Sequence, residues 1–230
     1  MSFIVLNNKK FSYTVVKKTI SSLRLRLKSS NSFIISCPRL TPNFVITQFI
    51  KKNANWIVSN SQKIIPKKPV KNLKALSILG QTYQLTFINT LHDSVVIYPE
   101  KMQIYANISK NTASHINQVL EKKLRPFALS LIKKELTLLK KEFKFNYNNV
   151  TVRNQSSRFG SCSSRGNLNF NWQIIFFPSE QFRHILLHEL THLKIKNHSK
   201  KFWDQLTIYD PNCKKNNLWL KKEGTKLFLF

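Results

Sequence analysis

The sequence predicts an α+β protein: a β-rich N-terminal lobe with one inserted helix, followed by a mainly helical half that contains a short sheet. Alternating apolar and polar residues dominate the first part of the chain, and helical spacing dominates from residue 111 onward. With 230 residues, of which 42% are hydrophobic, the chain can bury one sizeable core or two small ones. We assign residues 1–108 to the lobe and residues 109–230 to the second region.

The N-terminal lobe begins with a predicted β-hairpin. In "LRLRLK" three leucines alternate with basic residues, and "SSNS" then turns the chain into a second apolar run that ends at Pro38. A helix is predicted over about residues 42–62, with Thr41 as a possible N-cap and Pro42 at the first helical position. A basic linker, "IPKKPVKN", follows this helix. Further short strands are expected around residues 75–80, 82–89, 94–98 and 102–106.

The second region begins with apolar residues at helical spacing from 111 to 145. Pro126 lies inside this stripe, which predicts two helices or one helix kinked there. A strand, a polar loop and a second strand are expected next, and the loop holds two of the four glycines. The second strand, about residues 168–176, alternates apolar side chains with Asn and Gln, which is typical of a sheet edge beside a cleft. Another helix is expected to begin after Pro178.

The chain carries 38 Lys and Arg against 10 Asp and Glu, a net charge of +28. Such a charge attracts polyanions, which makes nucleic acid a candidate partner; a general enrichment in Lys, Asn and Ile is the alternative explanation. The sequence predicts no membrane-spanning helix and no secretion signal. Cys37, Cys162 and Cys213 are odd in number and widely spaced, which argues against a disulfide framework or a thiolate zinc site. We expect a cytoplasmic protein.

Residues 184–206, "HILLHELTHLKIKNHSKKFWDQL", contain four of the six histidines. On a helix His188 and His192 lie on one face, so that both can present ring nitrogens to one metal ion. Glu189 is displaced by about 100° around the helix, where it can reach a metal-bound water without being a ligand. This is the H-E-x-x-H pattern, in which the ion lowers the pKa of the water and the carboxylate takes its proton. The alternative is an amphipathic helix whose histidines are simply buried.

A hydrolytic zinc site needs a third protein ligand, and His198 is the candidate. On a straight helix His198 would lie about 9 Å beyond His192 along the axis, too far to share an ion. The helix is therefore predicted to break after about Lys194, with Asn197 in a left-handed conformation. Ser199 is expected to cap a new helix. His184, one turn before His188, is a candidate for packing or for the wall of the cleft.

At these positions the sequence resembles the YgjP-like zinc metallopeptidase family, which is related to the SprT and WLM-type metalloproteases. The matching residues are Arg158, Phe159, Gly160, Ser161 and Cys162, Asn171 in "NLNFNWQI", His188 to His192, Asn197 to Ser199, and Phe202 with Trp203. The resemblance implies a zincin-like catalytic region and a hydrolase that binds one Zn2+ ion, with His188, His192 and His198 as ligands and Glu189 as general base. Phe159 departs from the usual Trp of the family.

Three functions are compatible with these residues. The first is a zinc metallopeptidase acting on a peptide or protein, with the strand at residues 168–176 aligning an extended substrate. The second is a nucleotide (NTP or UTP) pyrophosphatase, an activity also attributed within the family. The third is a nucleic-acid-associated protease or a nucleic-acid-binding protein with a structural metal, for which Cys162 or Cys213 would be a fourth ligand. Arg158 and His184 are candidate contacts for the substrate or the transition state.

Overall fold

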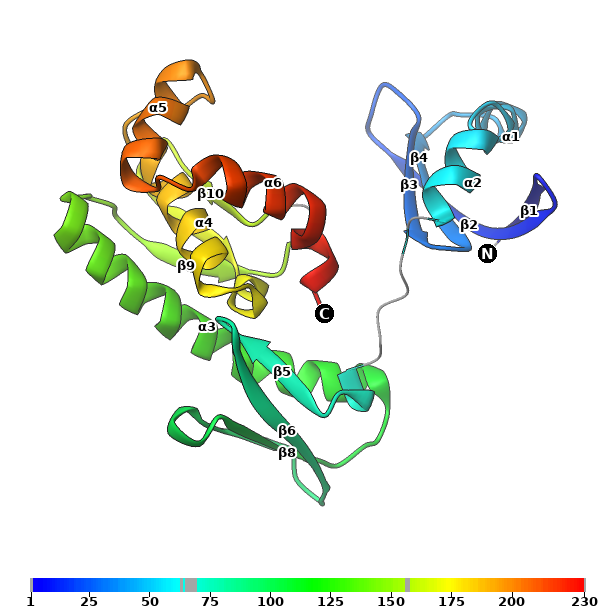
Figure 1. The fold of residues 1–230 in the computed structure, drawn as a ribbon. Coiled ribbons are helices and arrows are strands. Elements are labelled where there is room, and N and C mark those ends of the chain that lie inside the picture. The colour runs from blue at the N-terminus through cyan, green and yellow to red at the C-terminus, as the bar shows by residue number, and fades with distance from the viewer. Residues whose placement is uncertain (1, 63, 65–69, 156–157, 230) are drawn as a thin grey trace. The chain divides into compact units, whose positions relative to one another are not determined.

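The computed structural model describes residues 2–62, 64, 70–155 and 158–229. The chain divides into two compact units, Met1–Lys67 and Lys68–Phe230, and each has its own hydrophobic core. The described residues form three small sheets together with helices, which confirms the predicted α+β fold class (Figure 1). No helix in this part of the chain is both long and apolar enough to cross a membrane.

The N-terminal unit is a four-stranded sheet with two helices on one face. Its strands, in the spatial order β1-β2-β4-β3, are β1 (Ser2–Leu6), β2 (Lys9–Lys18), β3 (Arg24–Ser29) and β4 (Ser32–Pro38). The last two form the predicted hairpin. The predicted single helix is divided at Asn53 into α1 (Asn43–Lys52) and α2 (Ala54–Gln62). The side-chain amide of Asn53 donates to the carbonyl of Phe49 at 2.8 Å, so it competes with continuation of the helix.

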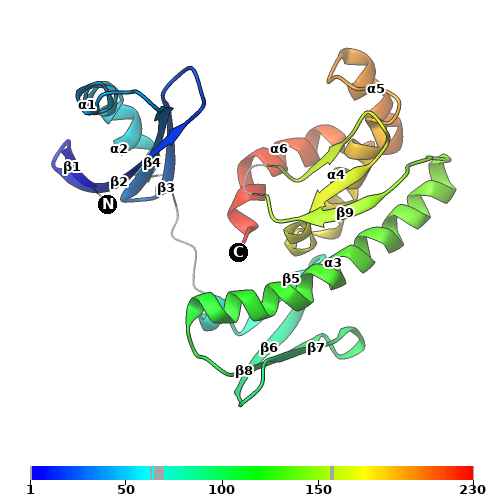
Figure 2. The same ribbon diagram turned by 180° about the vertical axis from the view of Figure 1, so that it is seen from behind.

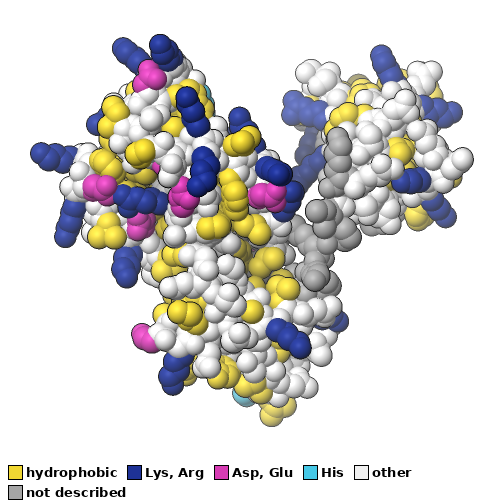
Figure 3. All heavy atoms as spheres, in the orientation of Figure 1, with side chains coloured by type: hydrophobic (Ala, Val, Ile, Leu, Met, Phe, Trp, Pro, Cys, Tyr) yellow, Lys and Arg dark blue, Asp and Glu magenta, His cyan; other side chains and the backbone are white. Residues whose placement is uncertain are grey.

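The N-terminal unit contains no acidic residue, since Asp93 is the first Asp or Glu of the chain. Arg24, Arg26 and Lys28 are exposed on β3, where they alternate with leucines that pack into the core. Figure 3 shows Lys and Arg side chains around this unit, whereas the other unit displays both signs of charge. The sequence of this unit therefore contains no Asp or Glu side chain to offset its positive charge.

The second unit begins with another four-stranded sheet, of order β5-β6-β8-β7. Its strands are β5 (Ala75–Ile78), β6 (Gln81–Asn89), β7 (Ser94–Tyr98) and β8 (Gln103–Ile108), as predicted. The helix α3 (Ala113–Phe143) then runs continuously through Pro126 (Figure 2). Ile104 and Ala106 of the sheet share one core with Ile116 and Leu120 of α3. The compact units therefore divide at residues 67/68, and not at the predicted boundary 108/109, because this sheet packs on α3. The basic linker lies mostly outside the described residues.

The rest of the second unit is a three-stranded sheet and three helices. The strands, in the order β10-β11-β9, are β9 (Val150–Arg153), β10 (Gly160–Cys162) and β11 (Leu168–Asn171), and the helices are α4 (Ser179–Thr191), α5 (Lys200–Tyr209) and α6 (Cys213–Glu223). The prediction of an edge strand at residues 168–176 is wrong. β11 pairs on both sides and ends at Asn171, whose side chain accepts from the Gln173 backbone N–H at 3.0 Å and caps a short 3-10 turn. The edge strands of this sheet are β10 and β9.

Candidate metal centre

The histidine helix, α4, ends where the chain must turn for a third histidine to approach. Its last regular residue is Thr191, and the Lys194 N–H donates back to the Thr191 carbonyl at 3.0 Å, which tightens the last turn. The predicted break is confirmed. The prediction for Asn197 is wrong, because this residue is not among the described non-glycine residues with positive φ. Its side chain instead accepts from the Ser199 backbone N–H at 3.4 Å, next to the start of α5.

Three imidazoles converge after this turn. One ring nitrogen from each of His188, His192 and His198 lies within 4.8 Å of the other two. The Nε2 atoms of His188 and His198 are 3.0 Å apart. Two ligands of a tetrahedral ion with bonds of 2.0–2.1 Å are separated by about 3.3 Å. Nδ1 of His192 donates to the Ile195 carbonyl at 3.0 Å, which leaves Nε2 for a metal. The three residues therefore fit a divalent ion.

Burial favours the neutral, metal-binding form of these rings. Burial, followed by the neighbouring histidines, lowers the pKa of His188 from its ordinary value to about 3. The pKa of His192 is also lowered, chiefly by burial. A neutral imidazole can offer a lone pair to a metal ion, whereas an imidazolium cannot. The two helical histidines are consequently in the state that ligation requires at neutral pH.

Two aromatic residues of α5 fix the positions of these rings. The fully buried Phe202 has its ring centroid 4.9 Å from that of His188, 4.6 Å from that of His192 and 4.8 Å from that of His198. Trp203 lies 5.9 Å from the ring of His198. One rigid side chain thus contacts all three imidazoles, which limits their freedom to turn away from a common point.

Glu189 follows His188 on α4, lines the same cavity and lies against β10. Only 7% of this residue is exposed, and burial raises the pKa of its carboxyl to about 8, although the positive charge of Arg158 opposes the shift. Its side chain passes so close to the Gly160 backbone that an added Cβ would lie 2.7 Å from Cγ of Glu189. The carboxyl therefore occupies a position that depends on the absence of a side chain at residue 160.

His184 is outside the group of converging imidazoles and belongs to a buried polar network. Its Nδ1 donates to Oδ2 of Asp210 at 2.5 Å, and the Asn216 amide donates to the same oxygen at 3.1 Å. Gln181 in turn donates to the side-chain oxygen of Asn216 at 2.9 Å. Burial raises the pKa of Asp210, but the hydrogen bonds from His184 and Asn216 outweigh this effect and hold it below its ordinary value. Asp210 and Asn216 could not be predicted from local sequence patterns, because both lie far along the chain from His184.

Neither candidate cysteine joins the converging group. Among the described residues, the set of His, Cys, Asp and Glu side chains that could hold an ion consists of the three histidines alone. The thiol of Cys162 lies 3.5 Å from the Ser163 carbonyl, and that of Cys213 lies 3.1 Å from Oγ1 of Thr207. Burial raises the pKa of Cys162, which disfavours its thiolate. These described residues provide three ligands, as an open catalytic site would, and not the four of a closed structural site.

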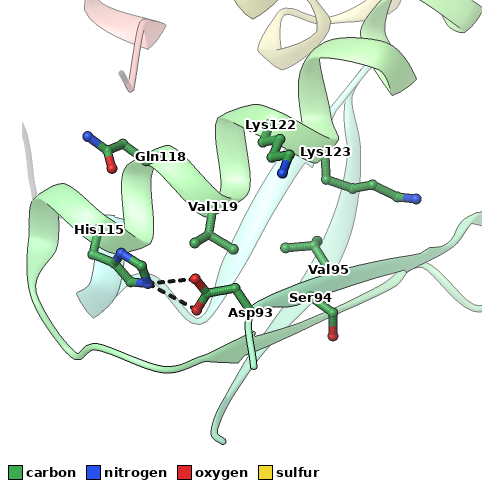
Figure 4. A pocket seen from close by; sticks show the side chains of 8 residues that line it. All are labelled: Asp93, Ser94, Val95, His115, Gln118, Val119, Lys122 and Lys123. Atoms are coloured by element: carbon green, nitrogen blue, oxygen red, sulfur yellow. Dashed lines mark hydrogen bonds and ion pairs between the residues drawn. The ribbon is translucent and has the colours of Figure 1, made fainter. Parts of the chain in front are cut away.

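A cavity of about 230 Å3 opens beside Glu189 and His188, between α4, β10 and α6. A larger hollow of about 490 Å3 lies between α3 and β7 (Figure 4). There Nε2 of His115 lies 2.9 Å from the Asp93 carboxylate, and Lys122 and Lys123 complete the wall. Its lining includes none of the converging histidines. Of these two cavities, the smaller is therefore the one that adjoins the candidate metal ligands.

Three converging histidines, two of them four residues apart with a glutamate directly after the first, are typical of metal-dependent hydrolases. Comparison with protein families identifies the particular group: the model of the YgjP-like metallopeptidase domain matches residues 21–223. The chain therefore belongs to the YgjP-like metallopeptidase family, as the sequence motifs predicted.

Comparisons with curated proteins and with solved structures provide less information than the family model. The search of curated proteins found no significant match. Among solved structures, the metallopeptidase zymogen jannalysin of Methanocaldococcus jannaschii is 27% identical over 40% of this chain and 95% of its own, with a TM-score of 0.36.

Proposed function

We propose that the protein is a zinc-dependent peptidase in which His188, His192 and His198 hold the ion and Glu189 is the general base. The observation that supports this most directly is the convergence of three ring nitrogens, one of them from His188, which lines the same cavity as the buried Glu189. Three neutral imidazoles that leave one coordination position open are the donor set of catalytic zinc. A zinc ion held there would supply Lewis acidity, lowering the pKa of a water molecule and polarising the substrate carbonyl.

Glu189 is suited to move the proton in this reaction. Its buried carboxyl lies against the backbone of β10 and lines the same cavity as His188. We assign it two transfers. The carboxylate takes a proton from the attacking water and then returns it to the nitrogen of the departing amine. The guanidinium of Arg158 lies near enough to influence Glu189 and is a candidate contact for the transition state.

The edge strand β10 is the element that we propose aligns the peptide. It pairs with β11 on one side only, and it runs alongside α4 with Gly160 against Glu189. An extended substrate that added to this edge by main-chain hydrogen bonds would pass directly over the catalytic carboxyl. This role replaces the one predicted for residues 168–176, because β11 has no free edge.

The test compares the wild-type protein with Glu189→Gln, which is nearly isosteric but cannot accept the proton. Both proteins are assayed for bound metal, for cleavage of an unfolded protein and for hydrolysis of nucleoside triphosphates. We expect about one zinc ion per chain in both, and peptide cleavage reduced by roughly 10²- to 10⁴-fold in the variant. Full activity of the variant would refute the role of Glu189. Hydrolysis of nucleotides without cleavage of any peptide would favour the pyrophosphatase alternative.

A second candidate function, nucleic-acid binding, is favoured by the acid-free N-terminal unit. Enrichment in Lys raises the number of cations throughout a chain, but it does not explain why residues 1–92 lack every acid. Arg24, Arg26 and Lys28 form an exposed row along β3. The logarithm of the binding constant for single-stranded DNA should fall linearly with the logarithm of the salt concentration, with a slope of about 0.7 for each phosphate contacted. Replacing these three residues by Gln should reduce that slope, whereas Lys51→Gln with Lys52→Gln on α1 provides the control. An unchanged slope would exclude this surface.

A further inference from the structure

We propose that the cavity beside Glu189 selects a substrate with a carboxylate next to the scissile bond, so that the enzyme prefers acidic peptides. This inference rests on the proposed peptidase function and specifies its substrate class. The residues that form the wall are Arg158, Phe159, Gly160, His184, Ile185, His188, Glu189, Asn217, Leu220 and Lys221. Two of them, Arg158 and Lys221, are permanent cations, and Glu189 is the single acid among these described lining residues.

The wall of the cavity combines residues of two helices. His188 and Glu189 come from α4, and Asn217 and Lys221 come from α6. A substrate group that enters the cavity while its peptide bond lies at Glu189 must therefore belong to a residue adjacent to that bond. The volume of about 230 Å3 suits one amino-acid side chain or a chain terminus, and not a folded segment.

The other acidic residue close to this wall does not cancel its positive charge. Asp210 lies behind His184, and its carboxylate is engaged by Nδ1 of His184, by the amide of Asn216 and by the backbone N–H of Asn212. His184 lines the cavity, whereas Asp210 does not. Besides Glu189 and the histidines, the polar side chains of the wall are the Arg158 guanidinium, the Lys221 ammonium and the Asn217 amide. All three donate hydrogen bonds, and a carboxylate is the planar acceptor that they match.

The positive lining continues beyond the cavity. A second hollow of about 480 Å3 shares Asn217 and Lys221 with the first, and its remaining wall includes Trp203, Lys214 and Leu218. Described residues that line this second hollow include no acid. A peptide that leaves the cavity along α6 thus meets exposed apolar surface flanked by two lysines. Acidic residues further along the substrate would be favoured for the same electrostatic reason.

The test uses the full zinc-loaded protein and a library of peptides derived from a digested proteome. Mass spectrometry of the products identifies the cleaved bonds, and we expect Asp, Glu or a C-terminal carboxylate beside them. One cleaved peptide is then synthesised with Glu, Gln or Lys at that position, and with a free or an amidated C-terminus. A charge-assisted hydrogen bond should make kcat/KM for the Glu peptide about ten- to a hundredfold higher than for the Gln peptide. The amidated peptides distinguish a side chain from a chain terminus.

Substitutions of residues that line the cavity test whether the preference for acidic peptides arises there. Lys221→Gln and Arg158→Gln should each reduce the Glu-to-Gln ratio by about tenfold, and Lys221→Glu should reverse the preference in favour of the Lys peptide. Lys222→Gln is the matched control, because this exposed neighbour on α6 does not line the cavity, and it should leave the ratio unchanged. Equal cleavage of Glu and Gln peptides by the wild type would overturn the inference and leave the peptidase proposal intact. Cleavage of no peptide at all would overturn both.

Discussion

Gly160→Ala should inactivate the enzyme without removing its metal. Gly160 has no positive φ that would require glycine, so its function is to leave space. A Cβ at this position would lie 2.7 Å from Cγ, 2.9 Å from Oε1 and 3.0 Å from Cδ of Glu189. Since carbon atoms pack at about 3.5 Å or more, the buried carboxyl must retreat by about 0.8 Å. A displacement near 1 Å in a catalytic group costs about a hundredfold in rate.

The assay measures kcat/KM on a cleaved peptide, zinc content and thermal stability. The overpacked variant should lose about 1–3 kcal/mol of stability, so a control of similar stability is needed. Gly80→Ala provides one, because Gly80 has φ +83 and an added Cβ there meets nothing closer than the Pro178 backbone at 3.9 Å. It should destabilise the same unit and keep full activity. If Gly160→Ala bound one zinc ion and retained wild-type kcat/KM, the assigned position of Glu189 would be wrong.

Three further predictions follow from the same site. His198→Ala should leave less than one zinc ion per chain after dialysis while the far-ultraviolet circular dichroism spectrum stays unchanged; stoichiometric zinc would contradict the three-histidine site. Chelation should lower the melting temperature, since an ion at 100 times its dissociation constant adds about 2.7 kcal/mol, and zinc should restore it. An unchanged melting curve would argue against binding. Asp210→Asn should lower the melting temperature by several degrees near pH 7, at about 2–4 °C per kcal/mol. Because the folded-state pKa of Asp210 is lowered, its contribution is present above the unfolded value of 3.8 and is lost as pH falls through the folded value. The difference between wild type and variant should therefore shrink below about pH 4, and a constant difference would show that the carboxylate charge is not involved.

Local spacing was sufficient to predict the helical half of the site. His188 and His192 are four residues apart, and His198 could approach them only if the helix ended, which it does at Thr191. How the chain changes direction after α4 could not be predicted from this spacing. A left-handed Asn197 is one solution, but backbone hydrogen bonds from Leu193 and Lys194 to the preceding turn achieve the change of direction with ordinary dihedral angles.

Features that depend on distant parts of the chain escaped prediction. β10 is only three residues long and has no periodicity of its own, so it exists because it pairs with β11. The Asp210 carboxylate that orients His184 is 26 residues away in sequence. The sequence pattern places the strands of residues 75–108 in the N-terminal lobe, because their alternation of apolar and polar residues resembles that of the first strands. Its assignment to a unit depends on packing against α3, which pattern alone does not reveal.

The absence of acidic residues from the N-terminal unit also affects how that unit folds. Its cations repel one another in the compact state more strongly than in the expanded chain, and no internal carboxylate offsets this repulsion. Added salt screens such repulsion over the Debye length of about 8 Å at physiological ionic strength. Sodium chloride should therefore stabilise this unit, whereas it weakens ion pairs such as those of Arg183 with Glu135 and Glu142 between α4 and α3. Salt therefore relieves repulsion in the N-terminal unit while it weakens these particular ion pairs of the second unit.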